Sequence, residues 1–405
     1  EQESFPFLTS DILHERDLEL QRTIRALEDG EEVTLVCLPS LTFERDHIKS
    51  ILGISHYETR SLWEALQATK DHVRVLFISS RKIPESVIEE LLSYLPNPVE
   101  ARERLELFDV GGEDEESPLV ERLLSNDILL QKLQNQLSGK KSLLKAFMST
   151  EKEEKLGREI GAPLWGLSSS LSYLHSKSGN HYIFEKANVS CADHIRDITS
   201  IGELKEGIEK LWSHHPHDQV FMFKFDHGVS GNGIARVQMG MGHFEFMQMK
   251  RDEREDYLEQ LISELEFKDE KMDREDFLYH LNKGAVFERF LDGDVITSPS
   301  GQAMIYPDGT VKILSTHEQI LDDYGVTYKG CVFPAKEDYR HQIQQSTQRI
   351  AESLNAHGVV GPISVDFLVV ENQEELSVNV IEVNIREGGT THPLQTTASL
   401  VQGEY

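Results

Sequence analysis

With 405 residues, the chain is expected to form two or three domains, because a single hydrophobic core seldom grows beyond about 250–300 residues. Hydrophobic residues make up 39% and charged residues 27%, a mix that excludes a disordered chain. Asp and Glu number 70 against 41 Lys and Arg, and the resulting formal charge of −29 argues against binding to nucleic acids or anionic membranes.

The sequence carries no targeting or disulfide pattern. No apolar run reaches the roughly 18–20 residues needed to span a bilayer, and no signal-peptide pattern opens the chain. Cys37, Cys191 and Cys331 lie far apart and have no metal-ligand spacing. We therefore expect a reducing, cytoplasmic setting. The sequence does not fix the oligomeric state, and a homodimer is compatible with it.

Residues 1–165 are predicted to form a first domain of the parallel α/β class. The buried strands of this domain are expected at 34–40, 73–79, 105–110 and 144–148. Its helical segments are expected at 58–70, 85–94, 119–137 and 151–160. Strands that alternate with helices imply a parallel sheet with right-handed crossovers.

The rest of the chain is predicted to form two α+β units, at 166–286 and 287–405. Strands are expected at 219–224, 233–238, 284–290, 301–306, 310–314, 363–370 and 376–383. The acidic amphipathic segment 252–281 is interpreted as helix with a solvated face, and a further helix is predicted at 335–357.

A glycine-rich hairpin offers the first candidate for ligand binding. Lys224 ends a predicted strand, and Gly228, Ser230, Gly231 and Gly233 follow it. Glycines let main-chain N–H groups approach phosphate oxygens closely, and the ammonium adds a point charge. The order differs from the P-loop pattern, in which the lysine follows the glycines and a helix comes next. The alternative is an ordinary turn.

Three oxygen donors on two neighbouring predicted strands form a stronger candidate. Glu382 and Asn384 are two residues apart, so their side chains point to the same face of a strand, and a hairpin would bring Asp366 beside them. Such an oxygen-only set suits Mg²⁺ or Mn²⁺. The alternative is a pair of acids on an exposed strand face, but burying them without a cation would cost several kcal/mol per charge.

The segment that follows these strands is rich in groups that bind anions. Arg386 can reach the same cleft, and its planar guanidinium suits a carboxylate or a transferring phosphoryl group. Gly388, Gly389 and Thr390 add main-chain and hydroxyl donors. His392 precedes a proline and is interpreted as a packed or capping residue.

One strand end could hold a nucleoside. Glu288 lies in a predicted strand that runs into a bend at Asp294. Main-chain groups at such an edge could bind adenine, and the acidic residue could hold ribose hydroxyls.

In this order the features resemble the ATP-grasp ligases, and most closely the pheganomycin-type peptide ligases, whose ATP-grasp domain also occurs in an IQ-motif protein of animals. The strings that carry the resemblance are LHSKSG at 174–179, KFDHGVSGNG at 224–233, SPSGQ at 298–302, LSTHEQ at 314–319 and EVNIREGGTTHP at 382–393. The first domain also resembles the domain that precedes ATP-grasp in that family, with LPSL at 38–41 and HYE at 56–58.

The resemblance implies an N-terminal α/β domain before a two-lobed fold that clamps ATP. Lys177 and Lys224 would hold the phosphates under the loop of residues 228–233. The main chain after Glu288 would contact adenine, and Asp294 would contact the ribose. The other implied roles are Mg²⁺ or Mn²⁺ binding by Asp366, Glu382 and Asn384, binding of the acyl phosphate or substrate carboxylate by Arg386, and lining of the substrate cleft by Ser300, Gln302, His317, Gly388, Gly389 and Thr390.

The implied activity is ATP-dependent ligation of a carboxylate to an amine through an acyl phosphate, with release of ADP and phosphate. Small molecules or peptides would supply the carboxylate and the amine. Two alternatives remain open: a nucleotide-binding scaffold without turnover, and a ligase with a non-amino-acid acceptor such as a polyamine or a thiol.

Overall fold

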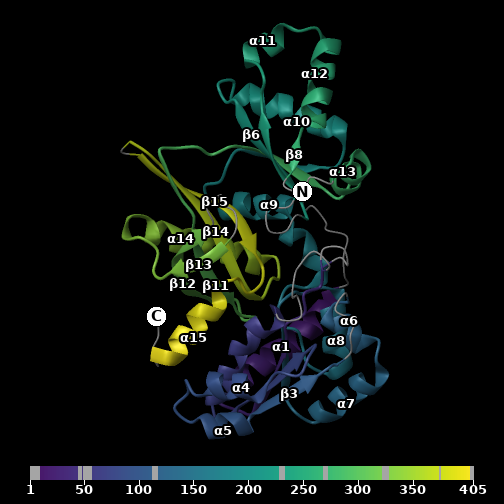
Figure 1. Ribbon diagram of the computed structural model, residues 1–405, viewed down its shortest axis with the longest axis vertical. Coiled ribbons are helices and arrows are strands. Elements are labelled where there is room, and N and C mark those ends of the chain that lie inside the picture. The colour runs from purple at the N-terminus through teal and green to yellow at the C-terminus, as the bar shows by residue number, and fades with distance from the viewer. Residues whose placement is uncertain are drawn as a thin grey trace.

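The computed structural model describes residues 10–43, 48, 57–111, 117–227, 233–267, 272–321, 328–373 and 375–401. This part of the chain forms three sheets arranged along the longest axis of the molecule, with the sheet of the C-terminal third between the other two (Figure 1). No helix within it combines the length and the apolar character that a membrane span needs.

The N-terminal sheet is parallel, as the alternating pattern predicted, with strand order β3-β2-β1-β4. Its strands are β1 (Val33–Leu38), β2 (Val73–Ser79), β3 (Leu105–Asp109) and β4 (Ser142–Ala146). Its helices are α1 (Ser10–Glu28), η1 (Glu58–Thr69), α4 (Glu85–Leu92), α5 (Pro98–Glu103), α6 (Leu119–Leu124), α7 (Asp127–Leu137) and α8 (Glu151–Ile160).

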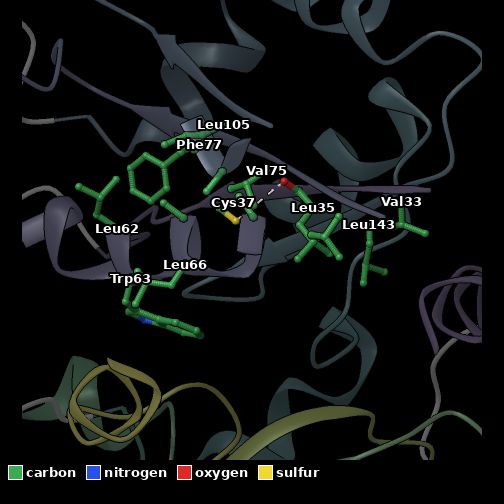
Figure 2. Packing of buried hydrophobic residues seen from close by; sticks show 14 of the residues in the cluster. Val33, Leu35, Cys37, Leu62, Trp63, Leu66, Val75, Phe77, Leu105 and Leu143 are labelled. Carbon is green, nitrogen blue, oxygen red and sulfur yellow. Dashed lines mark hydrogen bonds between the residues drawn. The ribbon is translucent and has the colours of Figure 1, made fainter. Parts of the chain in front are cut away.

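Both faces of this sheet are covered, which explains its continuous apolar strands. Leu35 and Cys37 of β1 face the apolar cluster shown in Figure 2, to which η1 adds Trp63. Val36 and Leu38 face a second cluster on the other side. The helices that cover both faces thus exclude water from the sheet.

Two predicted helices of this domain differ in the structure. The segment predicted as one helix at 119–137 is two, because Ser125 ends α6 and Asn126 caps α7 by accepting a hydrogen bond from the Leu129 amide at 3.1 Å. The segment predicted at 58–70 is a 3₁₀ helix, and helix α1 has no counterpart among the predicted elements.

The second sheet is antiparallel, with order β5-β9-β6-β7-β8. Its strands are β5 (His194–Ile198), β6 (Val220–Phe225), β7 (Ile234–Gln238), β8 (Glu266–Phe267) and β9 (Ala285–Arg289). Its helices are α10 (Ile201–His214), α11 (His243–Gln248), α12 (Arg251–Ser263) and α13 (Arg274–Leu281). The predicted helical segment 252–281 is therefore interrupted by β8, and the predicted boundary after residue 286 falls inside β9.

The third sheet has the order β10-β14-β11-β12-β13, and β15 pairs with the free side of β14. Its strands are β10 (Val295–Thr297), β11 (Pro299–Ile305), β12 (Val311–Leu321), β13 (Tyr328–Val332), β14 (Gly361–Asn372) and β15 (Glu375–Asn384). The associated helices are η2 (Ser169–His175), α9 (Lys177–Ala187), α14 (Glu337–Ala356) and α15 (Thr391–Val401). Helix α14 packs on β11 and β12, α9 contacts β15, and α15 reaches back to η1.

The close packing of α14 on β11 requires a glycine at position 301. A Cβ atom there would lie 2.3 Å from Oγ1 of Thr347. We expect Gly301→Ala to lower the free energy of unfolding by about 1–3 kcal/mol, the usual cost of overpacking a core. Urea denaturation measures this change. Gly202→Ala in α10 is the matched control, because a Cβ there meets nothing within 4 Å; an equal loss in both variants would contradict the packing argument.

Candidate active site

A row of polar side chains crosses one face of the third sheet. Ser300, Asp366 and Glu382 are successive partners across β11, β14 and β15, and His317 of β12 is the partner of Ser300. Directly opposed residues of antiparallel strands share a face. The Ser300 hydroxyl donates to Oδ1 of Asp366 at 2.6 Å, and the Gln319 amide donates to the same oxygen at 3.0 Å. The structure thus brings together residues from three separate motifs.

A second row lies two residues along the same strands and therefore on the same face. It runs from Ser315 through Gln302 and Ser364 to Asn384. The Gln302 amide donates to Ser315 at 3.0 Å, and the Asn384 amide donates to Oδ2 of Asp366 at 3.3 Å. The predicted metal trio of Asp366, Glu382 and Asn384 is therefore one contiguous group.

The two carboxylates of the first row have different electrostatic surroundings. Burial and the neighbouring Glu382 carboxylate raise the pKa of Asp366 to about 6. Burial also opposes ionisation of Glu382, but its ion pair with Lys177 outweighs burial and lowers the pKa of Glu382. A cation bound between the two carboxylates would offset the repulsion that raises the pKa of Asp366. The oxygen donors therefore fit a hard divalent ion.

The two predicted phosphate lysines come from different elements that Asp226 holds together. Lys177 is the first residue of α9, and Lys224 lies near the end of β6. Asp226, two residues further, accepts hydrogen bonds from the amide and the hydroxyl of Ser178, each at 2.8 Å. The pairs Lys177–Glu382 and Lys224–Glu288 place both ammonium groups beside the carboxylates of the site.

Glu288 is an ionised carboxylate in a buried position. Burial raises its pKa, but the ammonium of Lys224 and a hydrogen bond from His181, with Nε2 of the ring 3.0 Å from Oε2, outweigh this and lower the pKa to about 2. The negative charge therefore persists at any physiological pH. It pairs with Lys224, and the predicted adenine contact of the main chain after Glu288 stays a prediction.

The segment after β15 lies between the third sheet and the N-terminal domain. The guanidinium of Arg386 lies over the Phe147 ring, 5.1 Å from its centroid, and Nη1 donates to the Glu387 carbonyl at 3.0 Å. Further on, the Thr391 hydroxyl donates to Oε1 of Gln302 at 2.9 Å and accepts from the Gly388 amide at 3.0 Å. These contacts hold the segment over the second polar row.

Gly389 and Thr390, the remaining predicted donors of this segment, are also placed beside the third sheet. A Cβ on Gly389 would lie 3.1 Å from the Tyr328 ring, so a larger residue would push the ring away. Thr390 is buried. Their roles in substrate binding stay predictions.

His317 is a neutral histidine within the first polar row. Burial lowers its pKa to about 4, and its ring packs beside Phe333 with centroids 5.2 Å apart. Its Nδ1 atom makes no hydrogen bond to any residue that the structure describes. His317 therefore lies on the same face as Ser300 and Asp366 with one buried ring nitrogen unpartnered among the described residues, and its role in lining the substrate cleft stays a prediction.

Other predicted residues lie apart or beyond the described ranges. Asp294 accepts a hydrogen bond from the Gln373 amide at 3.2 Å, at the far end of the β14–β15 hairpin, so the structure does not bring it to Asp366. Gly233 directly precedes β7 and has a left-handed conformation, with φ of +78°. Gly228, Ser230 and Gly231 lie outside the described residues, as does His56 of the HYE string.

Asn180 and His175 are among the site residues that the sequence analysis did not predict. The side-chain oxygen of Asn180 accepts from the Val383 amide at 2.7 Å, which ties α9 to the strand between Glu382 and Asn384. Burial and the positive charges of Arg386 and Lys177 lower the pKa of His175 to about 4. Both residues lie within three positions of Lys177, and this closeness was the available signal.

A separate group of potential metal ligands lies behind Glu288. The ligand atoms of His181, Cys191 and His194 all lie within 4.8 Å of one another. The two ring nitrogens of His194 already face the Ala192 carbonyl and the Glu185 carboxylate, at 3.0 and 3.1 Å. We therefore assign no ion to this group.

Comparison with known proteins gives the family. A family model described as IQCH-like, ATP-grasp matches residues 169–275 and 270–390, which together exceed half of the chain. The chain belongs to the IQCH-like ATP-grasp family. The two polar rows, the two lysines and Arg386 are therefore features of an ATP-grasp domain, and the predicted resemblance is confirmed.

Two curated proteins are similar in sequence to this ATP-grasp protein. L-propargylglycine–L-glutamate ligase of Streptantibioticus cattleyicolor is 28% identical over 288 residues, covering 70% of this chain and 56% of the relative. IQ motif-containing protein H of Danio rerio is 22% identical over 412 residues, covering 91% of this chain and 38% of the relative. The chain thus spans about half the length of the first relative and less of the second.

Solved structures confirm the ATP-grasp fold. A biotin carboxylase complex with β,γ-ATP from Campylobacter jejuni superposes with a TM-score of 0.57 at 12% identity, covering 92% of this chain and 69% of that one. The biotin carboxylase domain of 2-oxoglutarate carboxylase from Hydrogenobacter thermophilus, solved with MgADP, gives 0.53 at 11% identity, with coverages of 92% and 70%. The predicted α/β domain followed by ATP-grasp lobes is therefore correct.

The pKa of Asp366 predicts how cation binding depends on pH. A carboxyl with a pKa of about 6 keeps its proton below that pH and must release it to bind a cation. We expect the affinity of the nucleotide-free protein for Mn²⁺ to fall about tenfold per pH unit below about pH 6 and to level off above it. Electron paramagnetic resonance of free Mn²⁺ measures this. Constant affinity between pH 5 and 7 would contradict the role of Asp366.

The same shift gives a sign for the stability of the cation-free protein. The pKa of Asp366 in the folded state is raised above the ordinary value of 3.8, so the folded protein binds more protons than the unfolded chain between about pH 4 and 6. The contribution of Asp366 to stability therefore falls as pH rises through that window.

Proposed function

We propose that the protein is an ATP-dependent ligase that joins a carboxylate to an amine through an acyl phosphate. The observation that carries the proposal is the set of Asp366, Glu382 and Asn384 in contiguous rows, with Lys177 paired to Glu382. The name of one curated relative, L-propargylglycine–L-glutamate ligase, supports it.

The residues of the chain have distinct parts in this proposal. Lys177 and Lys224 would exchange their glutamate partners for phosphate oxygens and so neutralise the triphosphate. A divalent ion held by Asp366, Glu382 and Asn384 would supply charge neutralisation at the transferring phosphoryl group. Arg386 would orient the acyl phosphate, because a planar guanidinium donates to two oxygens at once.

The proposed reaction consists of two displacement steps. An oxygen of the substrate carboxylate forms a bond to the γ-phosphorus as the bond to the ADP oxygen breaks, and ADP leaves with the electron pair. The amine nitrogen then forms a bond to the acyl carbon, phosphate leaves with its electron pair, and the nitrogen loses a proton. Positioning and charge stabilisation suffice for these steps, so no side-chain nucleophile is needed.

Release of ADP and phosphate from Mg-ATP across a panel of acids and amines tests the proposal. We expect release that requires both an acid and an amine and that yields an amide of matching mass. Binding of ATP without release under any pair would instead favour a nucleotide-binding scaffold. If ADP and phosphate are released with a polyamine or a thiol but not with an amino acid or peptide, the protein is a ligase with a non-amino-acid acceptor.

A further inference from the structure

One strand of the N-terminal domain reaches the segment that carries Arg386. Lys145 lies in β4, and Phe147 follows it by two residues, with its amide donating to the Leu38 carbonyl at 3.2 Å so that the pairing with β1 continues. Residues two apart in a strand point to the same side. The Nζ atom of Lys145 lies 3.3 Å from Oε1 of Glu387, and the Phe147 ring lies under the guanidinium of Arg386.

Lys145 is itself held from behind by η1. Its ammonium forms an ion pair with Glu64 and lies 5.0 Å from the centroid of the Trp63 ring. Figure 2 shows Trp63 at the edge of the apolar cluster that Cys37 also joins. These contacts therefore fix the position of the Lys145 ammonium group.

The three charged side chains are shielded from water. The exposed fraction is 15% for Lys145, 4% for Glu64 and 14% for Glu387. Burying charges is costly, and apolar residues of similar size would usually stabilise a fold as well or better. What a buried ion pair adds is a defined geometry between the segments that it joins.

We propose that Lys145 and Phe147 are positioning residues that fix Arg386, so that the N-terminal domain completes the active site of the ATP-grasp lobes. This inference rests on the proposed ligase function. Arg386 has Phe147 against its guanidinium, and the next residue, Glu387, is tied to Lys145. The other end of the segment is tied to the third sheet through Thr391 and Gln302.

The positioning predicts which kinetic step suffers. Lys177 and Lys224 pair with Glu382 and Glu288, and among the described residues neither lysine forms a hydrogen bond or ion pair with Lys145 or Phe147. Loosening the Arg386 segment therefore leaves nucleotide binding intact and slows transfer. A misplacement of about 1 Å at a reacting group can lower a rate by about 10²-fold.

The experiment compares Lys145→Met, Glu387→Gln and Phe147→Leu in the full chain. We expect kcat to fall by about 10²-fold in the first two and by less in the third, with affinity for ADP within about twofold of wild type. Lys145→Arg should recover most of the rate. Lys141→Met is the matched control, because Lys141 lies next to the same strand and its ammonium forms an exposed pair with Glu31.

A second measurement needs no acid or amine. ADP with Mg²⁺ and aluminium fluoride imitates the transferring phosphoryl group, and we expect it to bind at least about tenfold more weakly to Lys145→Met and Glu387→Gln than to wild type. Wild-type enzyme that binds this complex but ligates nothing would refute the proposed function and leave the positioning testable.

Two outcomes would overturn the positioning role. One is wild-type kcat and wild-type binding of the aluminium fluoride complex in folded Lys145→Met and Glu387→Gln. The other is an equal loss of ADP affinity and rate, which would indicate general structural damage. If Lys145→Met does not fold, Glu387→Gln and Phe147→Leu carry the test.

Discussion

Glu382→Ala is expected to abolish turnover while the protein stays folded. The carboxylate pairs with Lys177 and is the direct strand partner of Asp366, so its loss removes one oxygen donor from the proposed cation site. Losing one electrostatic stabiliser of a transition state typically lowers a rate by about 10²–10⁴-fold. ADP release in the presence of an acid and an amine measures the loss.

Glu375→Ala is the matched control for this variant. Glu375 begins the same strand, is exposed, and lies at the end remote from the site. Its removal should leave ADP release within about twofold of wild type, as is usual for surface changes. Turnover that survives in Glu382→Ala at the wild-type rate would be decisive against the metal assignment.

Lys224→Met is expected to weaken nucleotide binding by about 10- to 100-fold, since a charge-assisted hydrogen bond contributes about 1.5–3 kcal/mol. The variant also leaves the buried Glu288 carboxylate with His181 as its one remaining side-chain partner among the described residues. Its pKa should therefore rise. Calorimetric titration with ADP and Mg²⁺ measures the affinity.

Lys210→Met, on the exposed face of α10 in the same lobe, controls for the loss of a positive charge in a strongly acidic protein. An unchanged ADP affinity in Lys224→Met would remove Lys224 from the phosphate site. Equal weakening in both variants would point to long-range electrostatics instead.

The metal trio could be predicted only in part from local information. The spacing of Glu382 and Asn384 fixes their common face, but a register shift between Asp366 and Phe367 in the β14–β15 pair is what puts Asp366 opposite Glu382. The same logic did not reach Asp226, whose role depends on packing α9 against the end of β6. Nor did it reach Asn180, whose partner lies on β15.

The fold errors have a similar origin. The charge pattern at 252–281 predicted continuous helix, but pairing of β8 with β7, Phe267 opposite Ala235, interrupts it. The pattern at 58–70 could not distinguish a 3₁₀ from an α-helix, since apolar spacing is similar over a few turns. In the first case a contact between distant segments overrides the local helix preference, and in the second the sequence pattern does not determine the type of helix.

The pairs Lys177–Glu382 and Lys224–Glu288 have a consequence for how the nucleotide and the divalent ion affect each other's binding. Before any nucleotide arrives, each lysine already shares its charge with an acid. A triphosphate can recruit Lys177 only by leaving Glu382 uncompensated, and a divalent ion then restores neutrality. The two ligands thus promote each other's uptake, and each should raise the other's apparent affinity by the same factor.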